Sequence, residues 1–256
     1  MSNDKPIRRS RNQTRPGFTL TEILVVILII VVLAVISVSV VTRMKNRAND
    51  VKAVMDMRQI GVGISLYLSD RERLPRFGTG VSRVLVKNNT QSHAYILQPY
   101  LGFPEPTDKA EYPELLKPPG LKRDQMGGLK NWWDVTCYGM YSTNDIHKSK
   151  AYLPKGTLQD SMQTDVGPFG RTSNGTYPTT EGWSAAMLEK GLTKFSEDNG
   201  GKIVTLSMVP AMMEINAKQK NWPWTVPPTP IRGDHVNVLY FDWHVGSVKP
   251  DYFFKP

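Results

Sequence analysis

The chain has 256 residues, of which 40% are hydrophobic and 21% are charged, a balance that excludes a wholly disordered protein and suits one medium domain with an appendage. Of its net charge of +9, +4 lies within residues 1–17, and no run of Lys and Arg interleaved with aromatics follows. We therefore expect no nucleic-acid partner. The single cysteine, Cys137, cannot form an intrachain disulfide.

The first predicted segment, residues 1–17, is a basic leader that ends in Pro16-Gly17. Residues 18–42 follow as an apolar run whose one charge is Glu22. A helix needs about 20 apolar residues to cross the bilayer core, whereas the apolar part of a cleaved secretory signal has only about 7–15. The run therefore predicts a membrane-spanning helix over residues 18–42.

Glu22 is an unusual residue for a simple membrane anchor. A carboxylate inside a membrane-spanning helix costs roughly 2.5–3.5 kcal/mol on insertion scales. A lone anchor gains nothing from that cost, whereas a subunit gains if Glu22 meets a positive group on a neighbouring copy. The residues alone leave both interpretations open, a single-pass anchor and an assembling subunit.

The stretch Arg15-Pro16-Gly17-Phe18-Thr19-Leu20-Thr21-Glu22, followed by the apolar run, resembles the class III signal of type IV prepilins and type II secretion pseudopilins. The resemblance implies that a prepilin peptidase cuts after Gly17 and methylates the new N-terminal Phe18. It also implies that Glu22 pairs with the Phe18 amine of an adjacent subunit. The implied partners are further copies, other pilins or pseudopilins, the prepilin peptidase and the inner membrane.

Orientation follows from the resemblance more than from charge. Arg43, Lys45, Arg47 and Lys52 against Asp50 give a net charge of +3 just beyond the run, close to the +4 of the leader, so the positive-inside bias is slight. Cleavage requires a cytoplasmic leader. The expected localisation is a single-pass inner-membrane protein with a periplasmic head, and then a filament.

The helix is predicted to continue over residues 43–74. No proline occurs between Pro16 and Pro75, and apolar residues recur at helical spacing. These residues suggest one apolar stripe: Met44, Ala48, Val51, Met55, Val62 and Leu66. We expect the second half of the helix to pack under the head. Gly61 and Gly63 weaken the helix prediction by roughly 1 kcal/mol each. Two helices with a bend near residue 43 are the alternative.

Residues 75–256 are predicted to form a globular head. Short apolar runs broken by Pro, Gly and Asn predict a small antiparallel sheet and long loops, so the expected class is α+β. The clearest signal is a hairpin, 236–241 and 244–248, joined by Asp242-Trp243. The other expected elements are 81–86, 94–101, a short helix over 184–190 and a strand over 203–209, with a turn at 198–200 and surface loops over 104–128 and 218–233.

The C-terminal part weakly resembles a pseudopilin-like family that carries His, nine residues, then Asp-Gly. Asp242 matches the Asp of that motif, but Arg232 stands at its His position and Trp243 at its Gly position. The hairpin sequence itself and Leu97-Gln98-Pro99-Tyr100-Leu101 support the resemblance.

Sequence motifs for an enzyme are absent. There is no HExxH, no CxxC, no phosphate-binding loop and no Gly-x-Ser-x-Gly, so we expect no catalytic residues, no metal and no cofactor. The resemblance to pseudopilins leaves open a calcium site built from loop oxygens, but no acidic loop here has a clear ligand pattern. The four histidines are His93, His147, His235 and His244, and the latter two lie near Asp234 and Asp242. They are more typical of hairpin surface residues than of metal ligands.

Two functions therefore stand against each other. The first is a structural subunit of a type IV pilus or a type II secretion pseudopilus, in which residues 18–41 form the filament core. The second is a single-pass anchored protein whose head binds a ligand or glycan, with Trp222 and Trp224 as the best candidates for an exposed aromatic patch. The mature N-terminus distinguishes them.

Overall fold

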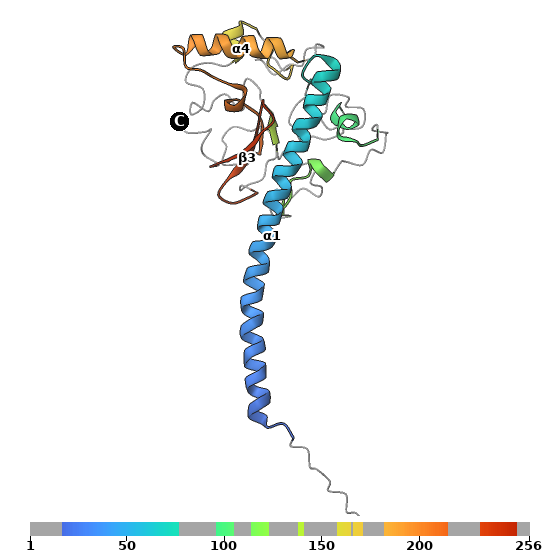
Figure 1. Cartoon of the computed structure of the whole chain (residues 1–256), viewed down its shortest axis with the longest axis vertical. Helices are drawn as coiled ribbons and strands as arrows, with labels where there is room; N and C mark the ends of the chain where they lie inside the picture. The colour runs from blue at the N-terminus through green and yellow to red at the C-terminus, as the bar shows by residue number, and fades with distance from the viewer. Residues whose placement is uncertain are drawn as a thin grey trace, which may run out of the picture. The chain divides into compact units, whose positions relative to one another are not determined.

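The computed structural model describes residues 17–76, 96–104, 114–122, 138–140, 158–164, 166–170, 182–214 and 231–249. The chain divides into two compact units, Met1–Asn46 and Arg47–Pro256. A long N-terminal apolar helix and a small antiparallel sheet are its main elements (Figure 1). This content is compatible with the α+β class predicted from the sequence.

Helix α1 runs without interruption over Leu20–Arg71, so no break occurs near residue 43. It ends three residues before the predicted boundary because Glu72 adopts a left-handed conformation, with φ of 59°, which closes a helix C-terminus. At this end the Tyr100 hydroxyl donates a hydrogen bond to Asp70 over 2.6 Å. Burial, together with that bond, raises the pKa of Tyr100 although the Arg71 contact opposes the shift.

The sheet has the strand order β1-β2-β3-β4, and every neighbouring pair is antiparallel. The strands are β1 (Tyr138–Met140), β2 (Pro210–Glu214), β3 (Val236–Tyr240) and β4 (Val245–Val248). All five residues of β2 and of β3 are buried. The predicted hairpin is thus confirmed as β3 and β4, and each observed strand is one residue shorter than predicted.

The turn between β3 and β4 explains the left-handed backbone conformation of Trp243. The Trp243 N–H donates to the Tyr240 carbonyl over 2.9 Å, and the Tyr240 N–H donates to the His244 carbonyl over 3.0 Å. This three-residue loop needs a left-handed residue in its last position, and Trp243 takes it with φ of 67°. A position that glycine normally occupies therefore carries a large side chain under backbone strain.

Helix α4 (Ala185–Asp198) confirms the helix predicted at 184–190 and extends it. The Ser184 hydroxyl accepts a hydrogen bond from the Met187 N–H at its start. The chain turns after it through Asn199 and Gly200, as expected. The shorter helices are α3 (Leu158–Met162), η1 (Pro99–Leu101), η2 (Glu114–Leu116) and η5 (Leu206–Met208).

Three predictions for the head need correction. Residues 203–209 do not form a strand: Ile203 is exposed, η5 occupies part of the range, and β2 begins only at Pro210. Within the expected surface loop 104–128, Leu115 and Leu116 are buried. Within 218–233, the side chain of Arg232 is buried. The expected element 81–86 lies outside the described residues, and 94–101 is represented by η1.

The core of the second unit packs the later part of α1 against the sheet and α4. Buried Met57, Ile60 and Ile64 of α1 belong to the same cluster as Leu239 of β3 and Phe195 of α4. The two glycines that weaken the helix prediction lie at close contacts: a Cβ on Gly61 would lie 3.1 Å from Leu239 Cδ1, and one on Gly63 would lie 2.7 Å from Leu101 Cδ2. The missing side chains therefore allow the head to approach α1.

Candidate functional site

The predicted processing site lies just before α1. Phe18 is 86% exposed, and a Cβ placed on Gly17 would meet no atom within 4 Å. Neither residue belongs to a helix or strand. The Gly17–Phe18 peptide is therefore sterically open, as a protease substrate requires. Residues 1–16 of the leader lie outside the described residues.

Glu22 contributes to the start of α1. Thr19 donates to Glu22 Oε2 twice, from its N–H over 2.8 Å and from its hydroxyl over 2.9 Å. The Glu22 N–H lies 3.2 Å from the Thr19 hydroxyl oxygen. This arrangement is a capping box, in which Thr and a Glu three residues later satisfy each other's free backbone groups. The spacing Thr19-x-x-Glu22 is visible in the sequence, but its capping role was missed there.

The capping box uses one oxygen of the carboxylate. Both contacts from Thr19 reach Oε2, and Oε1 has no hydrogen bond among the described residues. Glu22 and Phe18 are both exposed, so the residues implied in pairing are accessible. One carboxylate can therefore cap its own helix and still present an acceptor outward.

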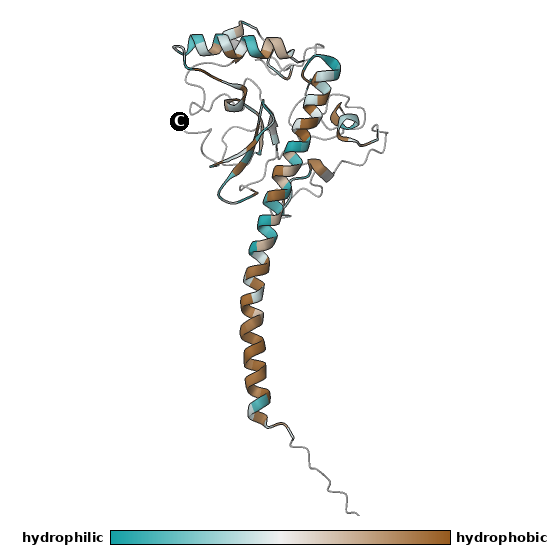
Figure 2. Ribbon diagram, in the orientation of Figure 1, coloured by the Kyte–Doolittle hydropathy of each residue, from teal (hydrophilic) through white to brown (hydrophobic). Residues whose placement is uncertain are grey.

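The apolar segment of α1 has the properties of a membrane span. Helix α1 is long and apolar enough to cross a membrane by length and composition, with its apolar window near the N-terminus. Figure 2 shows this first part of the helix as almost uniformly hydrophobic. Its hydroxyls bond to the helix backbone, since Ser37, Ser39 and Thr42 donate to the carbonyls of Leu33, Ile36 and Val38. These bonds lower the cost of polar groups in lipid.

The second half of α1 packs against the head, but through the side opposite to the apolar stripe seen in the sequence. Val51, Met55, Val62 and Leu66 are 50–58% exposed, and Met44 and Ala48 are exposed as well. The buried residues are instead Ala53, Met57, Ile60 and Ile64. Because successive helical residues rotate by about 100°, the two sets lie on opposite sides of the helix. We name Ala48, Val51, Met55, Val62 and Leu66 the outer stripe.

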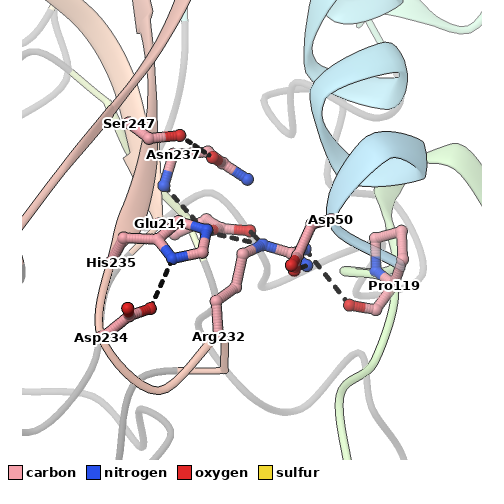
Figure 3. A network of polar contacts seen from close by, with 8 residues as sticks. All are labelled: Asp50, Pro119, Glu214, Arg232, Asp234, His235, Asn237 and Ser247. Atoms are coloured by element: carbon pink, nitrogen blue, oxygen red, sulfur yellow. Dashed lines mark hydrogen bonds and ion pairs between the residues drawn. The ribbon is translucent and has the colours of Figure 1, made fainter. Parts of the chain in front are cut away.

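A buried polar cluster ties α1 to the sheet within the second unit (Figure 3). Arg232 Nε donates to both oxygens of Glu214, over 3.0 and 3.2 Å. Its Nη1 donates to Asp50 over 2.9 Å and its Nη2 to the Pro119 carbonyl over 3.2 Å. Glu214 Oε2 also accepts from the Asn237 N–H over 2.9 Å. Every guanidinium nitrogen of Arg232 is thus engaged.

The Arg232 guanidinium stays charged although its side chain is buried. The side chains of Arg232 and Glu214 are 2% and 3% exposed. Burial acts to lower the pKa of Arg232, but the Glu214 carboxylate and the Asp50 hydrogen bond outweigh it, so the pKa is raised. The sequence did not predict this role of Arg232. A buried Arg in a loop gives no periodic signal by which a sequence could reveal it.

The hairpin histidines form two separate pairs. His235 Nδ1 contacts Asp234 over 2.7 Å, and this hydrogen bond lowers the pKa of Asp234. His244 contacts Asp242 and stacks on Tyr240. In the described part of the chain, no three His, Cys, Asp or Glu residues gather in a way that could hold a metal ion. His93, Cys137, His147, Trp222 and Trp224 lie outside that part.

Comparisons with known proteins identified no relative of the chain. No family model matches the chain, and the searches found no similar curated protein or solved structure. The function is therefore inferred from the chain's own residues.

Proposed function

We propose that the chain is a type IV pilin-like subunit, of a pilus or of a type II secretion pseudopilus, that is cleaved after Gly17 and polymerises through α1. The observation that carries the proposal is the outer stripe. A simple anchor needs apolar surface only where lipid covers it. This helix continues to expose apolar side chains on one side beyond the 18–42 span, while its other side is buried in the head.

The outer stripe can contribute substantially to association. Complete burial of a Val, Leu or Met side chain stabilises by about 1.5–3 kcal/mol, and the four large members are about half exposed. Covering the remaining surface would contribute about 1 kcal/mol for each residue. A neighbouring apolar helix is the natural cover, and the apolar segment of another copy supplies one.

Apolar contact along the outer stripe does not fix the axial position of one subunit against the next, and a charge pair at Glu22 would fix it. After cleavage, the N-methylated Phe18 amine remains cationic and can neutralise the Glu22 carboxylate of an adjacent subunit where water is scarce. Since Thr19 occupies only Oε2, the second oxygen can accept that contact. The partners are further copies, other pilins or pseudopilins, and the prepilin peptidase of the inner membrane.

The mass of the mature N-terminus tests the processing step. We expect a chain that begins at methylated Phe18 in cells with an active prepilin peptidase. An intact N-terminus there would contradict the proposal and favour the alternative, a single-pass anchored protein whose head binds a ligand or glycan.

Two substitutions of Glu22 separate its charge from its capping role. Glu22→Gln keeps an oxygen that can complete the capping box but removes the charge, whereas Glu22→Ala removes both. We expect both variants to be cleaved normally and to form no filaments by electron microscopy. Filaments of normal abundance from Glu22→Gln would refute the charge-pairing role.

The outer stripe is tested by Met55→Gln with Val62→Thr, which changes polarity with little change of size. We expect a folded, processed chain that does not assemble. The matched control is Ile203→Gln with Met208→Gln, which alters exposed apolar residues elsewhere in the second unit and should assemble normally. Equal assembly of the two double variants would show that the stripe has no role in polymerisation.

A further inference from the structure

Three basic residues follow the apolar segment of α1 directly. Arg43, Lys45 and Arg47 are exposed and make no ion pair within the described residues. Between Glu22 and Asp50 the sequence contains no acidic residue. We name these three residues the basic collar.

The nearest acidic residues are already engaged. The Asp50 carboxylate accepts a hydrogen bond from Arg232 over 2.9 Å, which draws it towards the buried cluster. Asp56 pairs with Lys52 over 2.9 Å. Among the described residues the collar therefore has no carboxylate partner, although Asp50 and Asp56 lie only three and nine residues beyond Arg47.

The collar surrounds the helix instead of forming one face. With a rotation of about 100° per residue, Arg43 and Arg47 share one side and Lys45 lies on the other. A protein partner docking on one side of the helix would meet only part of this charge. A planar surface through which the helix passes would meet all of it.

The axial position of the collar fits the headgroup layer of a membrane. At 1.5 Å per residue, Arg43 lies about 35 Å along the helix from Leu20, whereas the hydrocarbon core of a bilayer is about 30 Å thick. The collar itself spans about 6 Å, and long basic side chains can reach headgroups from such positions.

We propose that the basic collar binds the phosphate-bearing headgroups of anionic phospholipids where α1 leaves the membrane. The ligand class is a lipid such as phosphatidylglycerol, held by charge and by guanidinium hydrogen bonds to phosphate. The interaction requires that α1 is inserted in a membrane, but it does not require polymerisation. It takes place in the leaflet whose headgroups surround the collar. A chain that never forms filaments would still show it.

The test uses the full chain in phosphatidylcholine vesicles with trace spin-labelled phosphatidylglycerol or phosphatidylcholine. The fraction of motionally restricted label gives the relative association of each lipid with the protein. A cation at the surface enriches an anionic lipid locally by about fivefold. Averaged over all bordering lipids, we expect at least about a twofold preference for phosphatidylglycerol, weakened by NaCl.

The decisive variant is Arg43→Gln with Lys45→Gln and Arg47→Gln, which should show a clearly lower preference for phosphatidylglycerol than wild type. Arg43→Lys with Arg47→Lys should retain the wild-type preference. The matched control, Lys190→Gln with Lys194→Gln and Lys202→Gln, removes three cations in and after α4 and should behave as wild type. The basic residues of the leader remain in every variant, so the difference between the two triple variants isolates the collar.

Two results would overturn the proposal. One is an unchanged preference in the collar variant, or an equal loss in the control. The other is loss of the preference on adding inorganic phosphate at matched ionic strength, which would identify a free anion as the ligand in place of a lipid.

Discussion

Replacing Arg232 by Met tests whether the buried cluster holds the head to α1. The substitution keeps most of the side-chain volume but leaves Glu214, 3% exposed, with a buried charge. Of the hydrogen bonds to Glu214 described above, that from the Asn237 N–H would remain. Breaking one side of a buried ion pair costs about 3–5 kcal/mol. For a unit of this size, that loss would lower the midpoint of thermal unfolding by on the order of 10 °C.

The measurement is urea and thermal unfolding of the full chain in detergent micelles, followed by tryptophan fluorescence. Asp50→Asn is the control, because Asp50 contacts the same guanidinium from a side chain that is 39% exposed. Partly exposed pairs contribute about 0–1 kcal/mol, so this variant should be nearly as stable as wild type.

A second substitution tests whether the lost stability of Arg232→Met comes from the unpaired charge of Glu214. The double variant Arg232→Met with Glu214→Leu removes both buried charges and should recover most of the lost stability, because an apolar replacement of a buried pair is often neutral. A loss below about 1 kcal/mol in Arg232→Met, or a loss in Asp50→Asn as large as in Arg232→Met, would refute this reasoning.

Three further predictions concern backbone geometry. Trp243→Gly should be more stable than Trp243→Ala by about 1 kcal/mol in the same unfolding assay, since both lose the indole but only Ala keeps the left-handed strain; equal stabilities would contradict the strain. Gly182→Ala should lower the free energy of unfolding by about 1–3 kcal/mol, because its Cβ would lie 2.3 Å from the Pro168 carbonyl oxygen; an unchanged unfolding curve would contradict that contact. Thr19→Ala should cost the start of α1 about 1 kcal/mol, measured as faster amide hydrogen exchange over the first turn, whereas Thr19→Ser should exchange as wild type does.

Several elements could be predicted because their signals are local. The hairpin of β3 and β4 follows from alternating residues around a turn sequence, and the four backbone groups that close the turn lie within five residues. Helix α4 follows from Ser184 and an apolar spacing of three and four. The prediction of a strand at 203–209 was wrong because an apolar run does not show at which residue hydrogen bonding to a neighbouring strand begins. Pairing with Tyr240 fixes that start at Pro210.

In the candidate site too, the features that could be predicted are those with local signals in the sequence. The sequence by itself determined the apolar segment and the motif at Gly17, Phe18 and Glu22, because length, hydropathy and spacing carry that information within about 25 residues. It also contained the capping box between Thr19 and Glu22, which is a contact between residues three apart.

Tertiary structure alone decided which side of α1 faces the head. Both sides carry apolar residues at helical spacing, so periodicity could not choose between them. Gly61 settles the choice, because its missing side chain admits Leu239 and Trp243 from the distant hairpin. Packing across the fold also brings Asp50 to Arg232, 182 positions away. Contacts between residues more than 150 positions apart leave no local periodic pattern in a sequence, and so only the fold could show that the outer stripe and the basic collar are exposed.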